Sequence, residues 1–582
     1  MKKRVYLSAL FSIMLLAIIT ACSNDEDINS TKAVDVSKQI TFKMDFVDYN
    51  TGDSIEGKTR ASQSELDKKR IIPMGNIFAE VSVKRDTVKV PTKIKVASTR
   101  ALADGKYYVY AYQGSTQKGM MTGTMASNTF TPDGGIDGMS LVPGTYTFIC
   151  VNDKVNTSGS EWTVSRENIE TARMGIAENV VIAPTPKLQK VTFAMKHVGS
   201  RIRLFVHTEC SPYLQDNIKA TLSSTTDIPQ QVTFDPTTRT FTYGNTAAYS
   251  KNGLPAITPY TYLYFFPGTD ISDLKVTLNG GTAFKLPVNN NRSWSFSGHS
   301  LAPNESYILD ITLKYNYIYL YSDGTTGQYT DADFTSHTPV AIVVSRSKRL
   351  AVALHDAKSV FPGRGATETE ISALAWSNFS TAKQSNTTMS SNLSSHLTDF
   401  NGEAYTHETS YSSDGIIKGN NQADYPAFYE AAHYNPGVTL TGSIANAKWF
   451  LPTVGEWNLY YKNLRLRDND FEGYSTSNRG IAQPTNMYQY APDTFGMLRG
   501  NGEPLYWESG FNNPASVYLS SSESTPDKYY AFLTEGAPNM LWSGYVFDKQ
   551  DMLAFPKKLD NSTYVLTGST LVRIGIRPFI HY

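Results

Sequence analysis

Cys22 is the residue whose chemistry the sequence defines best. It is one of three cysteines in 582 residues, and it ends the segment Ile19–Cys22, in which small residues precede a cleavage site. The positive residues Lys2–Arg4 and the short apolar run Val5–Ile19 come before it, as in a secretory signal and unlike a transmembrane helix. A signal that ends at such a cysteine delivers a thiol for acylation, and each buried methylene adds about 0.8 kcal/mol of membrane affinity. We expect residues 1–21 to be removed as a lipoprotein signal peptide and Cys22 to carry lipid. The alternative is an ordinary signal peptide with a chance cysteine.

Patterns for metal binding and catalysis are much weaker. Asp468, Asp470 and Glu472 place oxygen ligands at alternate positions, and Gly473 follows as in a calcium loop. Arg479 occupies the twelfth position, where such a loop needs a bidentate glutamate, so we expect a solvated loop without metal. The sequence has no H-E-x-x-H or C-x-x-C pattern. We therefore expect no catalytic residues, no cofactor and no enzymatic activity.

The charge balance argues against a nucleic-acid partner. Lys+Arg and Asp+Glu both number 53, so no net positive charge attracts phosphates. After Cys22 only Cys150 and Cys210 remain, either as a disulfide or as two free thiols. The 36 tyrosines favour strands, and the mature chain is long enough for about three domains. The composition thus predicts a mainly β protein.

The first strand after the signal is predicted at residues 40–46. Apolar and polar residues alternate there, so one face of the strand is expected to be buried. The members of that face are Ile40, Phe42, Met44 and Phe46. An acidic run precedes the strand and a polar stretch follows it. We expect residues 22–70 to form a tether, this strand and a cleavable loop.

Three arginines after this strand are candidates for proteolytic cleavage. Arg60 and Arg100 each stand between a threonine and an alanine, and Arg70 ends a basic triplet. Proteases prefer exposed loops of this kind. Arg60 is the first candidate, because a cut at Arg100 would remove more of the sheet.

Strand patterns continue through residues 71–316. Alternating or apolar segments at 77–83, 107–112, 191–206, 260–266 and 301–313 indicate two β-sandwiches, at 71–186 and 187–316. From Tyr317 the composition changes, since five of the seven tryptophans follow it. Thr453 and Glu456 have the spacing of a helix capping box. Four tryptophans in this part are candidates for a ligand platform, although most such residues should be core: Trp449, Trp457, Trp507 and Trp542.

The order of these segments resembles the fimbrillin superfamily, the type V pilins of Bacteroidota. The resemblance rests on the lipid-attachment box, on Thr59–Ala61 after the first strand, and on VTFAMKHVGSRIRLFV and LAPNESYILDITLK, over roughly residues 1–315. It implies two transthyretin-like sandwiches and export as a surface lipoprotein of the outer membrane, as does the acidic run after Cys22. It also implies that a trypsin-like protease removes the first strand, and that a strand from another fimbrial subunit fills the vacated groove.

The C-terminal region, residues 317–582, resembles a C-type-lectin-like domain of bacterial surface proteins, related in fold to formylglycine-generating enzymes. The resemblance rests on WFLPTVGEWNLYY, YLSSSES, YYAFL and VRIGIRPF in that order. It implies an irregular α+β unit. The enzymes of this fold hold copper with two cysteines, which this region lacks, and the usual calcium-dependent sugar motifs are missing as well.

These features together predict a fimbrial subunit, with the tip adhesin as the first hypothesis. The last strand is expected within the C-terminal unit, so the chain could accept a strand but would have little to donate. The ligand would be a glycan or protein of a host or bacterial surface. The alternatives are a surface glycan-binding lipoprotein that does not polymerise, and a basal anchor subunit. A hydrolase is a third hypothesis.

Overall fold

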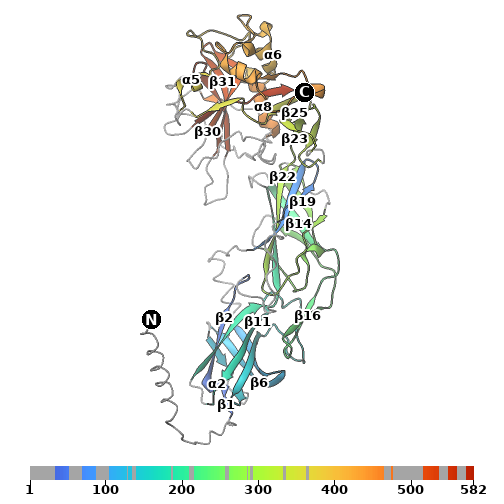
Figure 1. Cartoon of the computed structure of the whole chain (residues 1–582). Helices are drawn as coiled ribbons and strands as arrows, with labels where there is room; N and C mark the ends of the chain where they lie inside the picture. The colour runs from blue at the N-terminus through green and yellow to red at the C-terminus, as the bar shows by residue number, and fades with distance from the viewer. Residues whose placement is uncertain are drawn as a thin grey trace, which may run out of the picture.

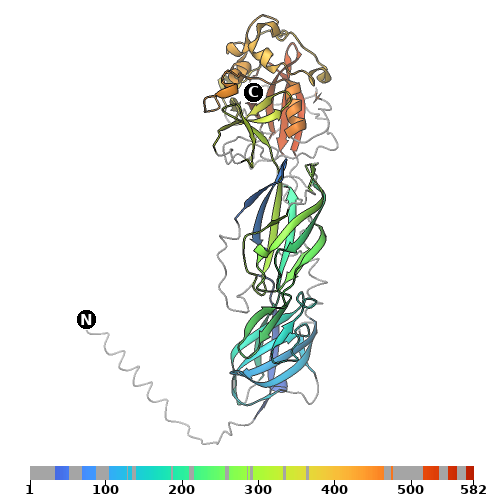
Figure 2. The ribbon, with the colours of Figure 1, turned by 90° about the vertical axis from the view of Figure 1, so that its right-hand side faces the viewer.

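The structure is a computed structural model of the whole chain (Figure 1). It describes residues 33–50, 68–86, 104–126, 129–133, 139–184, 188–208, 215–255, 261–284, 286–288, 293–331, 336–361, 366–464, 474–475, 515–536, 548–559 and 572–582. Within these residues the chain is mainly β, as the sequence predicts. Three units follow one another along an elongated molecule (Figures 1 and 2). None of the described helices has the length and apolar character needed to cross a bilayer.

The first unit is built on one large sheet. Its described strands are, in order across the sheet, β2 (Ile40–Phe46), β12 (Gln189–His197), β11 (Arg173–Ile182), β9 (Gly144–Asn152), β5 (Gly105–Gln113), β6 (Thr116–Ala126) and β7 (Thr129–Pro132). Neighbouring strands are antiparallel except β2 and β12, which run parallel. β1 (Val34–Asp35), the short helix α2 (Val36–Gln39) and β8 (Ser140–Leu141) contribute to the core on one face. A small sheet of β10 (Trp162–Val164), β15 (Gln231–Asp235) and β16 (Thr240–Gly244) contributes to the core on the other face.

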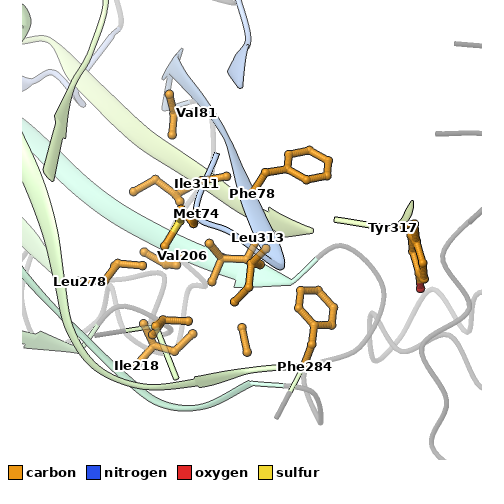
Figure 3. Close-up of a cluster of buried hydrophobic side chains, with 14 of the residues drawn as sticks. Met74, Phe78, Val81, Val206, Ile218, Leu278, Phe284, Ile311, Leu313 and Tyr317 are labelled. Atoms are coloured by element: carbon orange, nitrogen blue, oxygen red, sulfur yellow. The ribbon is translucent and has the colours of Figure 1, made fainter. Parts of the chain in front are cut away.

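The second unit packs two sheets around a continuous apolar core. One sheet contains β18 (Tyr262–Phe265), β13 (Ser200–Thr208), β22 (Ser306–Tyr315), β4 (Ile77–Arg85) and β3 (Arg70–Pro73). The other contains β17 (Ser250–Pro255), β14 (Gln215–Ser224), β19 (Leu274–Ala283), β20 (Leu286–Pro287) and β21 (Ser293–Ser295), and the 3-10 turn η2 (Ile271–Asp273) leads into β19. Figure 3 shows Val206, Leu278 and Ile311 gathered between these strands, and all three are fully buried.

The first two units are interleaved along the chain, since each contains strands expected in the other. β4, expected in the first sandwich, pairs with β22 along its whole length in the second unit. β12, expected in the second sandwich, instead lies beside β2 in the first sheet. Residues 71–186 and 187–316 therefore each contribute strands to both units. Pairing between distant segments is decided by which apolar faces can be buried together, and order along the chain does not reveal it.

The C-terminal unit combines an antiparallel sheet and a mixed sheet with short helices. One sheet contains β24 (Thr326–Gln328), β23 (Ile318–Tyr321), β25 (Pro339–Ser345), β26 (Leu350–Ala353), β34 (Phe579–His581) and β28 (Trp449–Phe450). The other contains β27 (Lys358–Val360), β33 (Val572–Ile576), β30 (Ala515–Thr525), β31 (Lys528–Gly536), β32 (Asp548–Pro556) and β29 (Tyr474–Ser475). The described helices are α5 (Glu368–Ser372), α6 (Gly402–His407), α7 (Pro426–Ala432) and α8 (Val454–Leu464), with 3-10 turns η5 (Leu393–His396), η6 (Thr409–Tyr411), η7 (Lys418–Asn420) and η8 (Gly442–Ile444).

The capping box predicted at the start of α8 is confirmed. The Glu456 carboxylate accepts a hydrogen bond from the backbone N–H of Thr453 at 2.7 Å, and the Thr453 hydroxyl accepts one from the N–H of Glu456 at 3.2 Å. Such reciprocal bonds satisfy backbone donors that the first helical turn leaves free. Glu456 is fully buried, and this burial raises the pKa of its carboxyl to about 8.

Candidate strand-exchange site

β2 forms one edge of the large sheet in the first unit. Each residue from Ile40 to Phe46 pairs with its counterpart in β12, in parallel register from Gln189 to Met195. The alternating apolar residues of β2 are buried, since Ile40, Phe42 and Met44 are at most 6% exposed. Phe46 is partly buried. The predicted strand and its inward face are therefore confirmed.

Phe42 is at the centre of the packing beneath β2. Its ring lies 5.7 Å from the ring of Phe193 in β12, 5.6 Å from that of Phe148 in β9 and 6.2 Å from that of Phe130 in β7. Aromatic pairs at these separations add roughly 0.5–1.5 kcal/mol each beyond simple burial. Phe42 thus connects three strands of the first unit through side chains alone.

β2 also brings the two ends of the sheet into contact. The sheet ends with β2 on one side and with β7 on the other, yet Phe42 and Phe130 are in ring contact. β2 therefore fills a seam between β12 and β7. If β2 left, the seam would open as an apolar groove, and β12 would expose unpaired backbone groups along that edge.

Met44 covers a buried thiol in the same seam. Its sulfur lies 4.0 Å from the Sγ atom of Cys150, which is a free and fully buried cysteine on β9. Burial raises the pKa of the Cys150 thiol above its usual range, so the thiol stays protonated and unreactive. Cys210 lies outside the described residues.

The outward face of β2 is polar. Thr41, Lys43 and Asp45 are exposed, and the Lys43 ammonium lies 2.5 Å from the Asp45 carboxylate. An exposed ion pair of this kind contributes at most about 1 kcal/mol. The strand is held by its inward side chains and its single row of backbone bonds to β12.

The segment before β2 makes further contacts with the first unit. Val34 pairs with Leu141 across β1 and β8, and the N–H of Val36 donates to the carbonyl of Met139 at 2.8 Å. Val36 is fully buried. Residues 34–46 therefore act together as one inserted segment.

Of the three candidate cleavage sites, only Arg70 lies within the described residues. Arg60 and Arg100, like Cys22, lie outside the described residues. Arg70 is exposed but is the first residue of β3, where it pairs with Val81 and its guanidinium donates to the carbonyl of Ser295 at 2.7 Å. A residue held in a sheet is a poor protease site, because the protease needs a free extended loop.

The proposed tryptophan platform is wrong for the two members that the structure describes. Trp457 is fully buried; its ring stacks on Phe532 at 4.6 Å and its N–H donates to the carbonyl of Leu519 at 3.2 Å. Trp449 is 4% exposed and packs against Tyr434. Both rings form core, because the helix α8 and the strand β28 turn them inward. Trp507 and Trp542 lie outside the described residues.

The weak calcium candidates Asp468, Asp470 and Glu472 also lie outside the described residues. In the part that is described, no group of three or more acidic, histidine or cysteine side chains could hold a metal ion.

The last strands of the sequence are interior strands of the C-terminal unit. β34 lies between β26 and β28, and β33 lies between β27 and β30. The Asp356 carboxylate accepts a hydrogen bond from the Arg577 guanidinium at 2.5 Å and forms an ion pair with the Arg573 guanidinium at 2.7 Å, and all three side chains are buried. Arg577 also donates to the carbonyls of Ala353 and Leu354. This region is therefore tied to β26 and β27 by buried charge as well as by backbone bonds.

The sequence pattern predicts the strand β2 but does not reveal most of the groove in which it lies. Val191, Phe193 and Met195 of β12 alternate with polar residues as β2 does, which was a usable signal for a second half-buried strand. Phe130 and Phe148 gave no such signal, because only the closure of the sheet brings them to Phe42.

Comparison with known proteins gives similarities of shape. No protein-family model matches the chain, and no curated protein matches it. Among solved structures, a fimbrial protein from Bacteroides ovatus is 10% identical over 82% of this chain and 94% of that chain, with a TM-score of 0.24. A fimbrial protein from Bacteroides vulgatus is 15% identical over 38% and 94%, with a TM-score of 0.22. A fimbrial assembly protein from Parabacteroides distasonis is 10% identical over 45% and 99%, with a TM-score of 0.24.

Proposed function

We propose that the protein is a fimbrial subunit that is exported as a lipoprotein, matured by proteolysis and assembled by strand exchange. The observation that carries the proposal is β2, an edge strand that fills an apolar seam and is followed in the sequence by the candidate cleavage site Arg60. Removing β2 would leave aromatic side chains and strand edges exposed to water. Pairing with a strand of a neighbouring subunit would relieve that cost.

Arg60 is the cleavage site that this mechanism favours. A cut after Arg60 releases the lipid, the tether and β2, and leaves β3 and β4 in place. A cut after Arg100 would separate β4 from the chain, although β4 is paired on both sides and its inward side chains are in the core of the second unit. A cut after Arg70 would fall within β3.

The position of β34 favours a role at the tip of the fibre. A subunit in the stalk needs a strand that it can donate to its neighbour. β34 is paired on both sides, and Phe579 and Ile580 are fully buried. It is therefore committed to the C-terminal unit, which we propose has a lectin-like fold and binds a glycan or protein of a host or bacterial surface.

The alternative is a lipoprotein that remains anchored, either as a glycan binder that does not polymerise or as the basal anchor subunit. Both alternatives require that Cys22 and β2 stay on the mature protein. β2 would then cover the edge of β12 permanently.

N-terminal sequencing of the protein from the cell surface separates these functions. The fimbrial proposal expects a mature N-terminus at Ala61, and an Arg60→Ala variant that stays uncut and outside the fibre fraction. An Arg70→Ala variant is the matched control and should mature normally. A wild-type surface protein that retains a lipidated Cys22 would overturn the cleaved fimbrial form in favour of the anchored one.

A further inference from the structure

The residues after β2 form a second contact, at the junction between the first two units. β2 ends at Phe46, and residues 47–50 continue from the first sheet towards the ends of β4 and β22. The N–H of Val47 still donates to the carbonyl of Met195 in the first unit at 3.0 Å. The N–H of Asn50 donates to the carbonyl of Asn304 at 2.9 Å, next to the second unit. The segment therefore spans the junction.

Tyr49 is inserted between the two units. Its ring stacks on the imidazole of His197, the last residue of β12, with 3.9 Å between the ring centroids and 16° between the planes. The guanidinium of Arg201 on β13 lies over the same ring at 4.2 Å. Tyr49 is only 9% exposed, and its hydroxyl has no hydrogen-bond partner among the described residues. The contacts of Tyr49 with His197 and Arg201 are therefore made by its ring and not by its hydroxyl.

The chemistry of His197 and Arg201 fits this recognition. Burial and the neighbouring guanidinium groups of Arg173 and Arg201 lower the pKa of His197, so its imidazole is neutral and stacks without charge repulsion. Arg201 is held in place by a 2.9 Å hydrogen bond to the Ser306 hydroxyl. A cation held over an aromatic face is attracted by the ring quadrupole.

Asn50 binds the ends of two strands through its side-chain amide. The amide nitrogen donates to the carbonyls of Asp86 at 3.0 Å and of Ser306 at 2.8 Å. The amide oxygen accepts from the N–H of Ser306 at 3.0 Å and from the Arg85 guanidinium at 3.2 Å. Asn50 adopts a positive φ of 61°, which asparagine tolerates better than most residues. Its side chain thus completes hydrogen bonds at the end of the β4–β22 pair.

We propose that this junction is a second acceptor site for strand exchange, and that it takes an aromatic ring together with a neighbouring side-chain amide from the incoming segment. The inference rests on the proposed function, because a cut after Arg60 removes Tyr49 and Asn50 along with β2. Arg201, His197 and the ends of β4 and β22 then lose these contacts. A strand that fills only the groove of β2 leaves them open, whereas one that extends to the junction closes both sites and fixes the two units to each other.

The test uses the full chain with a specific protease site inserted between residues 60 and 61. Cutting leaves the native N-terminal segment bound only by non-covalent contacts. Labelled synthetic peptides then displace it, and their binding to the cut protein is measured by fluorescence anisotropy. One peptide covers residues 34–50 and another residues 34–46. Three further peptides cover residues 34–50. One carries both Tyr49→Ala and Asn50→Ala, one carries Tyr49→Phe, and one carries the outward-facing control Lys43→Ala.

The junction site predicts that the 34–50 peptide binds about 100-fold more tightly than the 34–46 peptide, since one stacked ring and several hydrogen bonds to buried groups are added. The doubly substituted peptide should fall to the level of the short one. The Lys43→Ala peptide, and one with Tyr49→Phe, should bind like the native 34–50 peptide. Equal capture of the long and short peptides would overturn the junction site and leave strand exchange intact. Capture of neither peptide after the native segment has left would overturn both.

Discussion

Replacing Phe42 by alanine should release β2 without unfolding the rest of the protein. Phe42 is 6% exposed and touches three aromatic rings on three different strands. Truncating such a buried phenylalanine costs about 3–5 kcal/mol. In the released state the side chain is in water, so the whole cost falls on the bound state of the strand. At about 1.4 kcal/mol per factor of ten, even the lower figure raises the population of released β2 about 100-fold.

The Cys150 thiol provides the assay. It is buried beneath Met44, so a maleimide reaches it only when β2 has left. Under native conditions the labelling rate follows the population of the open state when closing is faster than labelling. With Cys22 and Cys210 replaced by serine, we expect Phe42→Ala to label about 100-fold faster than the parent protein.

Two matched variants test whether labelling of Cys150 reports the release of β2. Lys43→Ala changes the exposed face of the same strand and should alter the rate by no more than about threefold, as for a surface ion pair. Ile311→Ala removes a fully buried side chain from the core of the second unit. If Ile311→Ala speeds maleimide labelling as much as Phe42→Ala does, Cys150 is reached by global unfolding. If the labelling rate of Phe42→Ala is unchanged, β2 does not depend on its aromatic contacts.

Three further predictions concern the other parts of the molecule. Cys22→Ser should abolish incorporation of a clickable palmitate analogue, whereas Cys150→Ser should not; labelled Cys22→Ser protein would contradict the lipid anchor. The pKa of Glu456 is raised from 4.5 to about 8 in the folded state, so between pH 4.5 and pH 8 the folded protein holds a proton that the unfolded chain has lost. The contribution of Glu456 to the free energy of unfolding therefore falls as the pH rises through this range, by at most about 1.4 kcal/mol per pH unit. Glu456→Gln should flatten that part of the melting-temperature profile of the C-terminal unit, and an unchanged slope would assign it to other groups. Asp356→Ala removes the carboxylate that neutralises two buried guanidinium groups and should cost about 3–5 kcal/mol in urea unfolding, whereas the exposed Asp527→Ala should cost little.

Local patterns in the sequence predicted local structure well. The alternation in residues 40–46 gave both the strand and its buried face, because side chains of a strand point to opposite sides in turn. Thr453 and Glu456 gave the start of α8, since a capping box needs only neighbours three residues apart. The strand pattern at 191–206 is confirmed by β12 and β13, which occupy most of it.

What the sequence did not reveal depends on distant contacts. β12 and β13 follow each other directly, yet they belong to different sheets and meet only at the junction. The parallel pairing of β2 with β12 joins residues about 150 positions apart, so no local pattern can predict it. The tryptophans Trp449 and Trp457 were ambiguous for a similar reason, because an aromatic side chain suits both a core and a ligand platform.

The pairing of β22 has a mechanical consequence for a molecule that carries load. β22 leads directly into the C-terminal unit, where the Tyr317 hydroxyl donates to the carbonyl of Leu464 at 2.9 Å. Along its length β22 is bonded to β13 on one side and to β4 on the other. Tension applied through the C-terminal unit would therefore act along β22 and load these two ladders in shear, so that many backbone bonds must break together. If the uncleaved molecule is pulled, we expect the second unit to resist extension better than the first, where β2 is held by a single ladder.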